Sequence, residues 1–221
     1  MKFIDLTHSL TNDIPFWDGD CGFSLSVVTD YTDCTPPDLF RTQRVNMPVG
    51  LGTHMDSPAH VSPGAKTIDQ LELHDLVIDC IVISISDASE DFVATPELVE
   101  QFEKEHGKIP EHSFVIFNFG WNKRWPDIET YRNNFTFPTV HESTAKLLLE
   151  RNIAGLGVDT LSADNGSAGF PVHRAILGAG KYLVENVANL DEVPPMGAKI
   201  LVMPIKIKDG TEAPIRLVAM T

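Results

Sequence analysis

The chain has 221 residues, of which 43% are hydrophobic and 22% charged, a composition typical of a globular protein and not of a disordered one. Its 17 basic residues against 31 acidic ones give a net charge of −14, which repels nucleic-acid phosphates and anionic lipid surfaces. Its three cysteines form neither a thiolate zinc motif nor a disulfide framework. We therefore expect a cytoplasmic protein with neither nucleic acid nor membrane among its partners.

The predicted strands are short runs rich in isoleucine and valine, separated by glycine and proline. In chain order they span Val77–Ser86, Ser113–Phe119, Ile153–Val158, Tyr182–Leu190, Ile200–Lys208 and Pro214–Met220. The Asp-Gly pair at 209–210 predicts a hairpin between the last two. The stretch from Gly19 to Pro48 has no clear period and is interpreted either as an irregular strand pair or as a lid-like loop.

Helices are fewer than strands. Thr95–His106 has an N-cap residue, a proline at the first helical position and Gly107 as a stop signal. Ser143–Asn152 is a second helix, and a short third one is predicted from Val172 to Leu177. Helices placed between strands favour a mixed α/β or α+β domain.

The segment from Gly50 to His60 stands out chemically. Prolines at 48, 58 and 63 exclude a helix through it, so the backbone is extended or turning and residues two apart point to the same side. His54 and Asp56 then lie about 6.6 Å apart along a strand. Because metal bonds from nitrogen and oxygen are about 2.0–2.2 Å long, both side chains can converge on one ion. Gly50 and Gly52 leave room for a substrate to approach.

A His-x-Asp pair also has a simpler explanation, a histidine hydrogen-bonded to a nearby acid, and the spacing alone leaves both open. His60 adds a third imidazole to the same short segment. Any further ligand must come from elsewhere in the chain, where sequence spacing does not identify it.

This segment resembles the signature of the metal-dependent cyclase-like hydrolases, the family that includes bacterial kynurenine formamidase and isatin hydrolase. Its pattern, His-x-Gly-Thr-His-x-Asp-x-Pro-x-His, is matched at every fixed position from Gly52 to His60. Other similar stretches follow in the same order along nearly the full length: Ile4–His8, Pro15–Asp20 with its tryptophan, Gly157–Ser162, Pro171–His173, Glu185-Asn186 and Pro214–Arg216.

The resemblance implies an α/β fold: one cyclase-like domain over residues 1–221, built as a mixed, barrel-like β-sheet with flanking helices and assembling as homodimers or homotetramers. It also implies divalent metal. In the family the counterpart of Asp56 bridges two ions, of which the match to His54 binds the first and the matches to His173 and Glu185 bind the second. The match to His60 is the proposed general acid/base. The match to Trp17 lines the substrate pocket, often that of a neighbouring subunit.

One position departs from the family pattern. Gly50 stands where the family's first metal-binding histidine belongs, and losing a ligand weakens a metal site. Three outcomes stay open: a single ion held by His54, Asp56, His173 and Glu185, a weak second ion completed by water, or a replacement ligand from elsewhere, for which His8 and His74 are candidates by composition. We favour one tightly held ion. With nitrogen and oxygen ligands only, zinc and manganese are the leading metals and iron is possible.

The implied activity is hydrolysis of a small formyl amide, cyclic amide or lactone by metal-bound hydroxide, with His60 moving the proton. N-formylkynurenine is the leading substrate type, which implies tryptophan catabolism. The alternatives are a lactone- or cyclic-imide-opening enzyme and a degenerate relative that only binds a small molecule. Trp17 beside Phe16 offers a flat wall for an aromatic substrate, although without the resemblance such a tryptophan is more often a core or interface residue.

The remaining polar residues have local explanations. Asp159 and Ser162 are candidates for the floor of the site, or for a turn after a buried strand. Asp164 is interpreted as a turn residue. His74 is expected to cap or pair locally beside Asp75.

Overall fold

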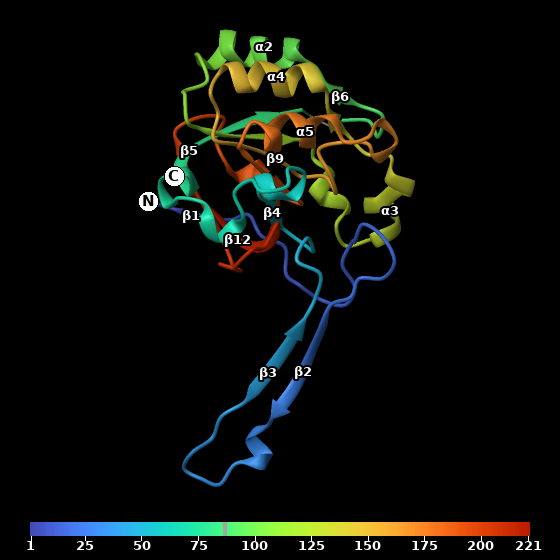
Figure 1. Cartoon of the computed structure of the whole chain (residues 1–221), viewed down its shortest axis with the longest axis vertical. Coiled ribbons are helices and arrows are strands. Elements are labelled where there is room, and N and C mark those ends of the chain that lie inside the picture. Colours follow the sequence, from blue (N-terminus) through green and yellow to red (C-terminus); the bar gives the residue numbers. More distant parts are fainter. Residues whose placement is uncertain (86–87) are drawn as a thin grey trace.

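Seven strands close into a mixed barrel in this computed structural model, which describes residues 1–85 and 88–221 (Figure 1). Around the barrel the order is β4 (His54–Asp56), β12 (Glu212–Met220), β11 (Ala198–Pro204), β5 (Val77–Ser84), β7 (Phe114–Asn118), β9 (Gly155–Val158) and β10 (Tyr182–Glu185), which pairs with β4 again. The four strands from β5 to β10 run parallel, and the other contacts are antiparallel. The other half of β12 pairs with β1 (Phe3–Asp5).

Alternation along the parallel strands divides the core into two layers. On β7, which is buried throughout, Phe114 and Ile116 face the barrel interior, whereas Val115 and Phe117 join a second apolar cluster outside it. Helices cover this outer face: α2 (Pro96–His106), α4 (Glu142–Glu150) and α5 (Pro171–Gly178) (Figure 1). The expected α/β fold, a mixed barrel-like sheet with flanking helices, is confirmed.

A two-stranded arm projects from the body of the molecule (Figure 1). Its strands, β2 (Ser24–Thr29) and β3 (Thr42–Asn46), are antiparallel and irregular between Val27 and Thr29. Of the two interpretations of residues 19–48, the strand pair is therefore correct. The arm exposes a series of large apolar side chains: Leu25, Val27, Val28, Tyr31, Leu39, Phe40 and Val45.

The predicted elements exist, with shifts at their ends. The strand predicted over Tyr182–Leu190 is too long, because Asn186 adopts a left-handed φ of 58° and ends the ladder at Glu185. Its apolar continuation packs against the barrel interior without being a strand. The predicted hairpin joins β11 and β12, although through a connection longer than a tight Asp-Gly turn. Ser86, predicted as the end of β5, lies outside the described residues.

Short elements without a strong pattern were missed. They are the strands β6 (Val93–Ala94) and β8 (Thr139–Val140), which pair with each other, and the helices α1 (Leu73–Leu76) and α3 (Ile128–Arg132). Within residues 1–85 and 88–221, none of the helices has the length and apolar character that crossing a membrane requires.

Candidate metal centre and substrate pocket

Strand β4 lies between β10 and β12, and this position gathers the site. His54 is in register with Glu185 of β10, and Asp56 is in register with Glu212 of β12. Met55 between them is fully buried in the barrel core, so His54 and Asp56 share the opposite face. The expected extended backbone, with residues two apart on one side, is confirmed.

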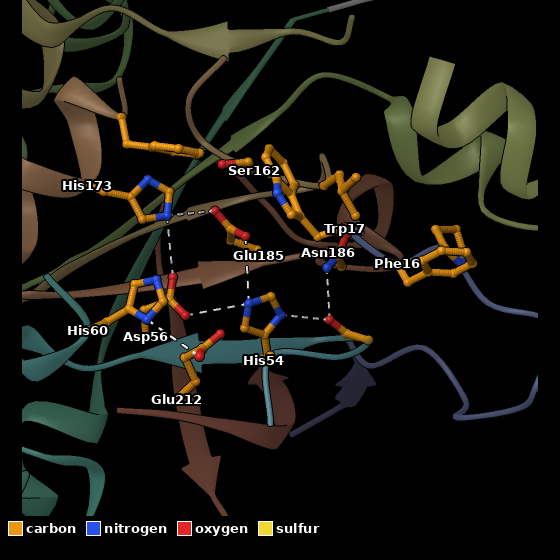
Figure 2. A pocket seen from close by; sticks show the side chains of 15 residues that line it. Phe16, Trp17, His54, Asp56, His60, Ser162, His173, Glu185, Asn186 and Glu212 are labelled. Carbon is orange, nitrogen blue, oxygen red and sulfur yellow. Dashed lines mark hydrogen bonds and ion pairs between the residues drawn. The ribbon is translucent and has the colours of Figure 1, made fainter. Parts of the chain in front are cut away.

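The four residues proposed as metal ligands from the sequence come together in this buried site (Figure 2). Nε2 of His54 lies 3.5 Å from Oδ1 of Asp56 and 3.6 Å from Oε2 of Glu185. Nε2 of His173, at the start of α5, lies 3.5 Å from Oδ2 of Asp56 and 3.3 Å from Oε1 of Glu185. The structure thus brings ligand atoms from β4, β10 and α5 together around the carboxylate of Asp56.

The imidazoles of His54 and His173 are both held so that Nε2 faces the carboxylate of Asp56. Nδ1 of His54 is 2.9 Å from the carbonyl oxygen of Gly52, and Nδ1 of His173 is 2.8 Å from Oδ2 of Asp164. Asp164 also accepts hydrogen bonds from the backbone N–H groups of Val172 and His173. Asp164 therefore does more than the predicted turn residue would. It caps two free backbone N–H groups at the start of α5, and it orients His173, as partners of metal-binding histidines commonly do.

The electrostatics of the cluster suit a cation. Burial lowers the pKa of His54, but the carboxylates of Asp56 and Glu185 raise it by more, so the net shift is upward. Burial also opposes a charge on His173, yet Asp164, Asp56 and Glu185 together hold its pKa well above the ordinary value. The pKa of Asp56 is lowered: burial raises it, but hydrogen bonding from His173 and the charge of His54 outweigh that effect. Carboxylates dominate this buried site.

A divalent ion fits the residues present. Two groups of three ligand atoms each lie within 4.8 Å of one another and share Asp56: His54, Asp56 and Glu212 form one, and Asp56, His173 and Glu185 the other. Among residues 1–85 and 88–221, buried Oδ1 of Asp56 finds no hydrogen-bond partner, and such an orphaned acceptor calls for an explanation such as a bound ion. Imidazole nitrogen and carboxylate oxygen are ligands that zinc and manganese accept. The four predicted ligands are thus distributed over two adjoining groups.

Glu212 was missed by sequence reasoning. It is the first residue of β12, and Oε2 lies 3.5 Å from Nδ1 of His60. The neighbouring residues 208–211 indicated a turn, and nothing in the linear pattern connects position 212 with position 56. Only the pairing of β12 with β4, which closes the barrel, brings Glu212 to the site.

The two replacement ligands considered from composition lie elsewhere. The ring of His8 stacks on Trp125 at 3.9 Å, and burial lowers its pKa to about 4. His74 pairs with Asp75 on the surface, as expected, with 3.3 Å between Nε2 and Oδ1. Neither lines the pocket described next.

His60 and Trp17 border a cavity of about 300 Å³ above the cluster. His60 is partly exposed, and hydrogen bonding to Glu212 raises its pKa. Trp17 packs against Phe170 and Phe135 of the same chain, with ring centroids 5.7 and 4.8 Å apart.

The two residues considered for the floor of the site differ in position. Ser162 lines this cavity, whereas Asp159 lies behind it and accepts hydrogen bonds from the backbone of Phe119, Trp121 and Asn122. The cavity lining comprises Pro15, Phe16, Trp17, Gly50, Gly52, His54, Asp56, His60, Leu161, Ser162, Phe170, His173, Glu185, Asn186 and Glu212.

Comparison with known proteins agrees with this geometry. A family model described as a putative cyclase matches residues 4–165. The chain belongs to the cyclase family. An isatin hydrolase of Roseibium aggregatum is 33% identical over 187 residues, which cover 76% of this chain and 70% of that protein. A kynurenine formamidase of Bacillus cytotoxicus is 26% identical over 98% of this chain and 96% of its own length.

Comparison with solved structures supports the same family. Isatin hydrolase A from Labrenzia aggregata, bound to benzyl benzoate, superposes with a TM-score of 0.91 at 32% identity, over 100% of this chain and 93% of that one. An isatin hydrolase bound to the product analogue thioisatinate gives a TM-score of 0.92 at 26% identity, over 100% and 92% of the two chains. The family resemblance seen in the sequence is therefore confirmed, and the protein is a cyclase-family hydrolase.

Proposed function

We propose that this cyclase-family hydrolase cleaves the carbonyl–nitrogen bond of a small amide that carries an aromatic ring, with an N-formylkynurenine-type formamide as the leading substrate. The observation that carries the proposal is that one partly exposed imidazole, His60, lines the same cavity as the buried carboxylate–imidazole cluster and the aromatic side chains of Phe16 and Trp17 (Figure 2). A proton carrier, a candidate metal centre and a flat apolar surface then meet in one cavity.

The proposed metal is zinc or manganese, with His54, Asp56, His173 and Glu185 as ligands. When bound, such an ion supplies Lewis-acid chemistry, which activates water as a nucleophile and polarises the substrate carbonyl. The protein's part is to fix the ligand atoms: Gly52 and Asp164 each hold the Nδ1 side of an imidazole, and burial excludes bulk water from the carboxylates.

His60 is proposed as the general acid/base. It would accept a proton from the attacking water and donate it to the leaving nitrogen as the carbon–nitrogen bond breaks. Glu212 stabilises the protonated imidazole, since hydrogen bonding to it raises the pKa of His60. The side chain of His60 is 34% exposed, so after turnover it can re-equilibrate its proton with solvent.

The aromatic wall supports a planar substrate. Phe16, Trp17 and Phe170 line the cavity together with the cluster, and aromatic faces favour flat apolar groups. The cavity volume of about 300 Å³ is at the small end of the range for ligand pockets. A substrate of one or two rings is therefore favoured over a polymer.

A cyclic amide of the isatin type is the second candidate. It is favoured by the 33% identity with a protein named isatin hydrolase and by the close superposition on two isatin hydrolase structures. Opening a cyclic amide, imide or lactone uses the same groups as formamide cleavage. The two candidates differ in their products. Formamide cleavage releases two separate molecules, whereas ring opening keeps both new groups in one molecule.

The deciding experiment is a substrate comparison on purified protein reconstituted with zinc or manganese. Turnover of N-formylkynurenine, isatin, an aromatic lactone and a cyclic imide is followed by absorbance, with chelated protein as the control. We expect metal-dependent turnover of the formamide or of the cyclic amide. Turnover that persists after chelation would contradict the metal-dependent mechanism, and binding of both amides without turnover would make the protein a non-catalytic relative.

We also propose that the protein is a homodimer or homotetramer. An isolated two-stranded hairpin is marginally stable in water, and the β2–β3 arm exposes apolar side chains along its length. A second copy of the chain that covers them would account for both features. The cytoplasmic location and the role in tryptophan catabolism stay predictions.

A further inference from the structure

Gly50 and Glu212 compete for the same volume. A β-carbon added at Gly50 would overlap Oε1 of Glu212 and would lie 3.0 Å from its Cδ and 3.6 Å from Cδ2 of His54. The backbone of Gly50 is not in the left-handed region, so its conformation does not itself require glycine. A side chain at position 50 would have to displace the Glu212 carboxylate, the far end of a flexible side chain that arrives from β12.

This carboxylate completes a set of three ligand atoms. Glu212 joins His54 and Asp56 in a group whose atoms lie within 4.8 Å of one another. The set is one imidazole and two carboxylates, the same composition as the adjoining group of Asp56, His173 and Glu185. Figure 2 shows Glu212 below Asp56, between His60 and His54 in the view.

An independent observation points to a ligand at this position. Oδ1 of Asp56, the oxygen 3.5 Å from Nε2 of His54, is buried and has no hydrogen-bond partner in the part of the chain that the structure describes. Asp56 as a whole is only 2% exposed. A buried carboxylate oxygen without a donor is costly, whereas a cation between Asp56, His54 and Glu212 would satisfy it.

We propose that Glu212 is a metal ligand that replaces the histidine missing at position 50, and that it holds a divalent ion with His54 and Asp56. A second ion then binds beside it to Asp56, His173 and Glu185. The proposal rests on the proposed function, since it assumes that the cluster binds metal. It replaces the single tightly held ion favoured from the sequence with a pair of sites bridged by Asp56.

The competing role for Glu212 is to orient His60, whose Nδ1 lies 3.5 Å from Oε2. The two roles predict different metal contents. A residue that only orients His60 can be removed without changing how many ions the chain holds. A ligand cannot, since the loss of even an indirect partner commonly weakens metal binding about 10–100-fold.

The test is the number of ions per chain, measured by elemental analysis after loading with Mn²⁺ or Zn²⁺ and desalting. Four proteins are compared: the wild type, Glu212→Ala, Glu212→Ala with Gly50→His, and Glu192→Ala as an exposed acidic control. The thermal midpoint of each metal-free protein checks the fold. We expect two ions in the wild type and the control, one in Glu212→Ala, and two again in the double variant, because the histidine enters the volume that the glutamate leaves.

Each other outcome is decisive. If Glu212→Ala holds as many ions as the wild type, Glu212 is not a ligand, and the proposed function stands without it. If the wild type holds one ion, the proposal for Glu212 survives only if Glu212→Ala loses that ion and the double variant regains it. If the wild type holds no ion under any loading, the proposed function itself is wrong.

Discussion

Asp164 Oδ2 lies 2.8 Å from Nδ1 of His173, and both side chains are buried. An ionised carboxylate can only accept, so the imidazole donates through Nδ1 and presents Nε2 to Asp56 and Glu185. The orientation of a candidate metal ligand therefore depends on a residue that faces away from the pocket. Asp164→Asn should weaken metal binding by about 10–100-fold, because an amide also offers a donor toward Nδ1 and stabilises the histidine less well.

Competition with a chromophoric chelator measures this affinity, and the thermal midpoint of the metal-free protein checks the fold. Asp79→Asn is the matched control, since Asp79 forms an exposed ion pair with Lys199 on the barrel surface. Unchanged metal affinity in Asp164→Asn would mean that Asp164 serves only to cap the N-terminus of α5.

His60→Gln tests the proton carrier. We expect kcat to fall by about 10²–10⁴-fold, the usual contribution of a positioned acid/base group, while the number of bound ions stays the same. The measurement pairs steady-state kinetics on the best substrate with elemental analysis. His141→Gln, an exposed histidine at the start of α4, is the control. Unchanged turnover in His60→Gln would rule out the proposed role.

The segment around His54 shows how far the sequence alone reaches. Prolines and the His-x-Asp spacing predicted an extended backbone with both side chains on one face, and β4 has that geometry. This prediction succeeded because period two is a local property of a strand. The runs rich in isoleucine and valine identified β5, β7 and β9, with errors at their ends, because strand-favouring composition is also a local property of the chain.

Glu212 and Asp164 show why the rest was missed. Glu212 reaches Asp56 only through the β12–β4 pairing that closes the barrel, a contact between residues far apart in the chain. Asp164 sits in a sequence typical of a turn and lies in a bend, but its carboxylate also contacts a histidine nine residues later. In both cases the side chain's partner is set by tertiary structure, which no periodicity records.

Trp17→Leu tests the aromatic wall. If a planar substrate packs against Trp17, losing the aromatic face should cost about 1 kcal/mol and raise KM by about fivefold, with a smaller effect on kcat. Steady-state kinetics measures the split, and Phe3→Leu on the exposed face of β1 is the control. A KM equal to that of the wild type would place the substrate elsewhere in the cavity.

Glu103 predicts how stability depends on acid. This residue of α2 accepts hydrogen bonds from Arg151, at 2.9 Å, and from Lys108. These partners, Arg151 first, lower the pKa of Glu103 from 4.5 to about 2. Because the folded-state pKa is depressed, the stabilisation is complete above the unfolded pKa and is lost as the pH falls from about 5 toward 2.

Glu103→Gln should therefore lower the free energy of unfolding by about 2 kcal/mol at pH 7. The difference in this free energy between the variant and the wild type should decrease steadily below pH 5. Urea denaturation at several pH values measures it. Glu105→Gln on the same helix, which is exposed, controls for the loss of a charge. A free-energy difference that stays constant down to pH 2 would contradict the lowered pKa of Glu103.

The arm offers a test of self-association that leaves the site intact. Leu25 and Val45 are directly opposite each other in the β2–β3 register, and both side chains are about half exposed. Light scattering should give a mass that is two or four times 24.4 kDa. Leu25→Ser with Val45→Ser should shift the mass toward a single chain, because it removes apolar area from the proposed interface. Leu73→Ser, which changes an exposed leucine on α1, should leave the mass unchanged. A monomeric wild type, or a double variant that keeps the wild-type mass, would show that the arm is not the interface between copies.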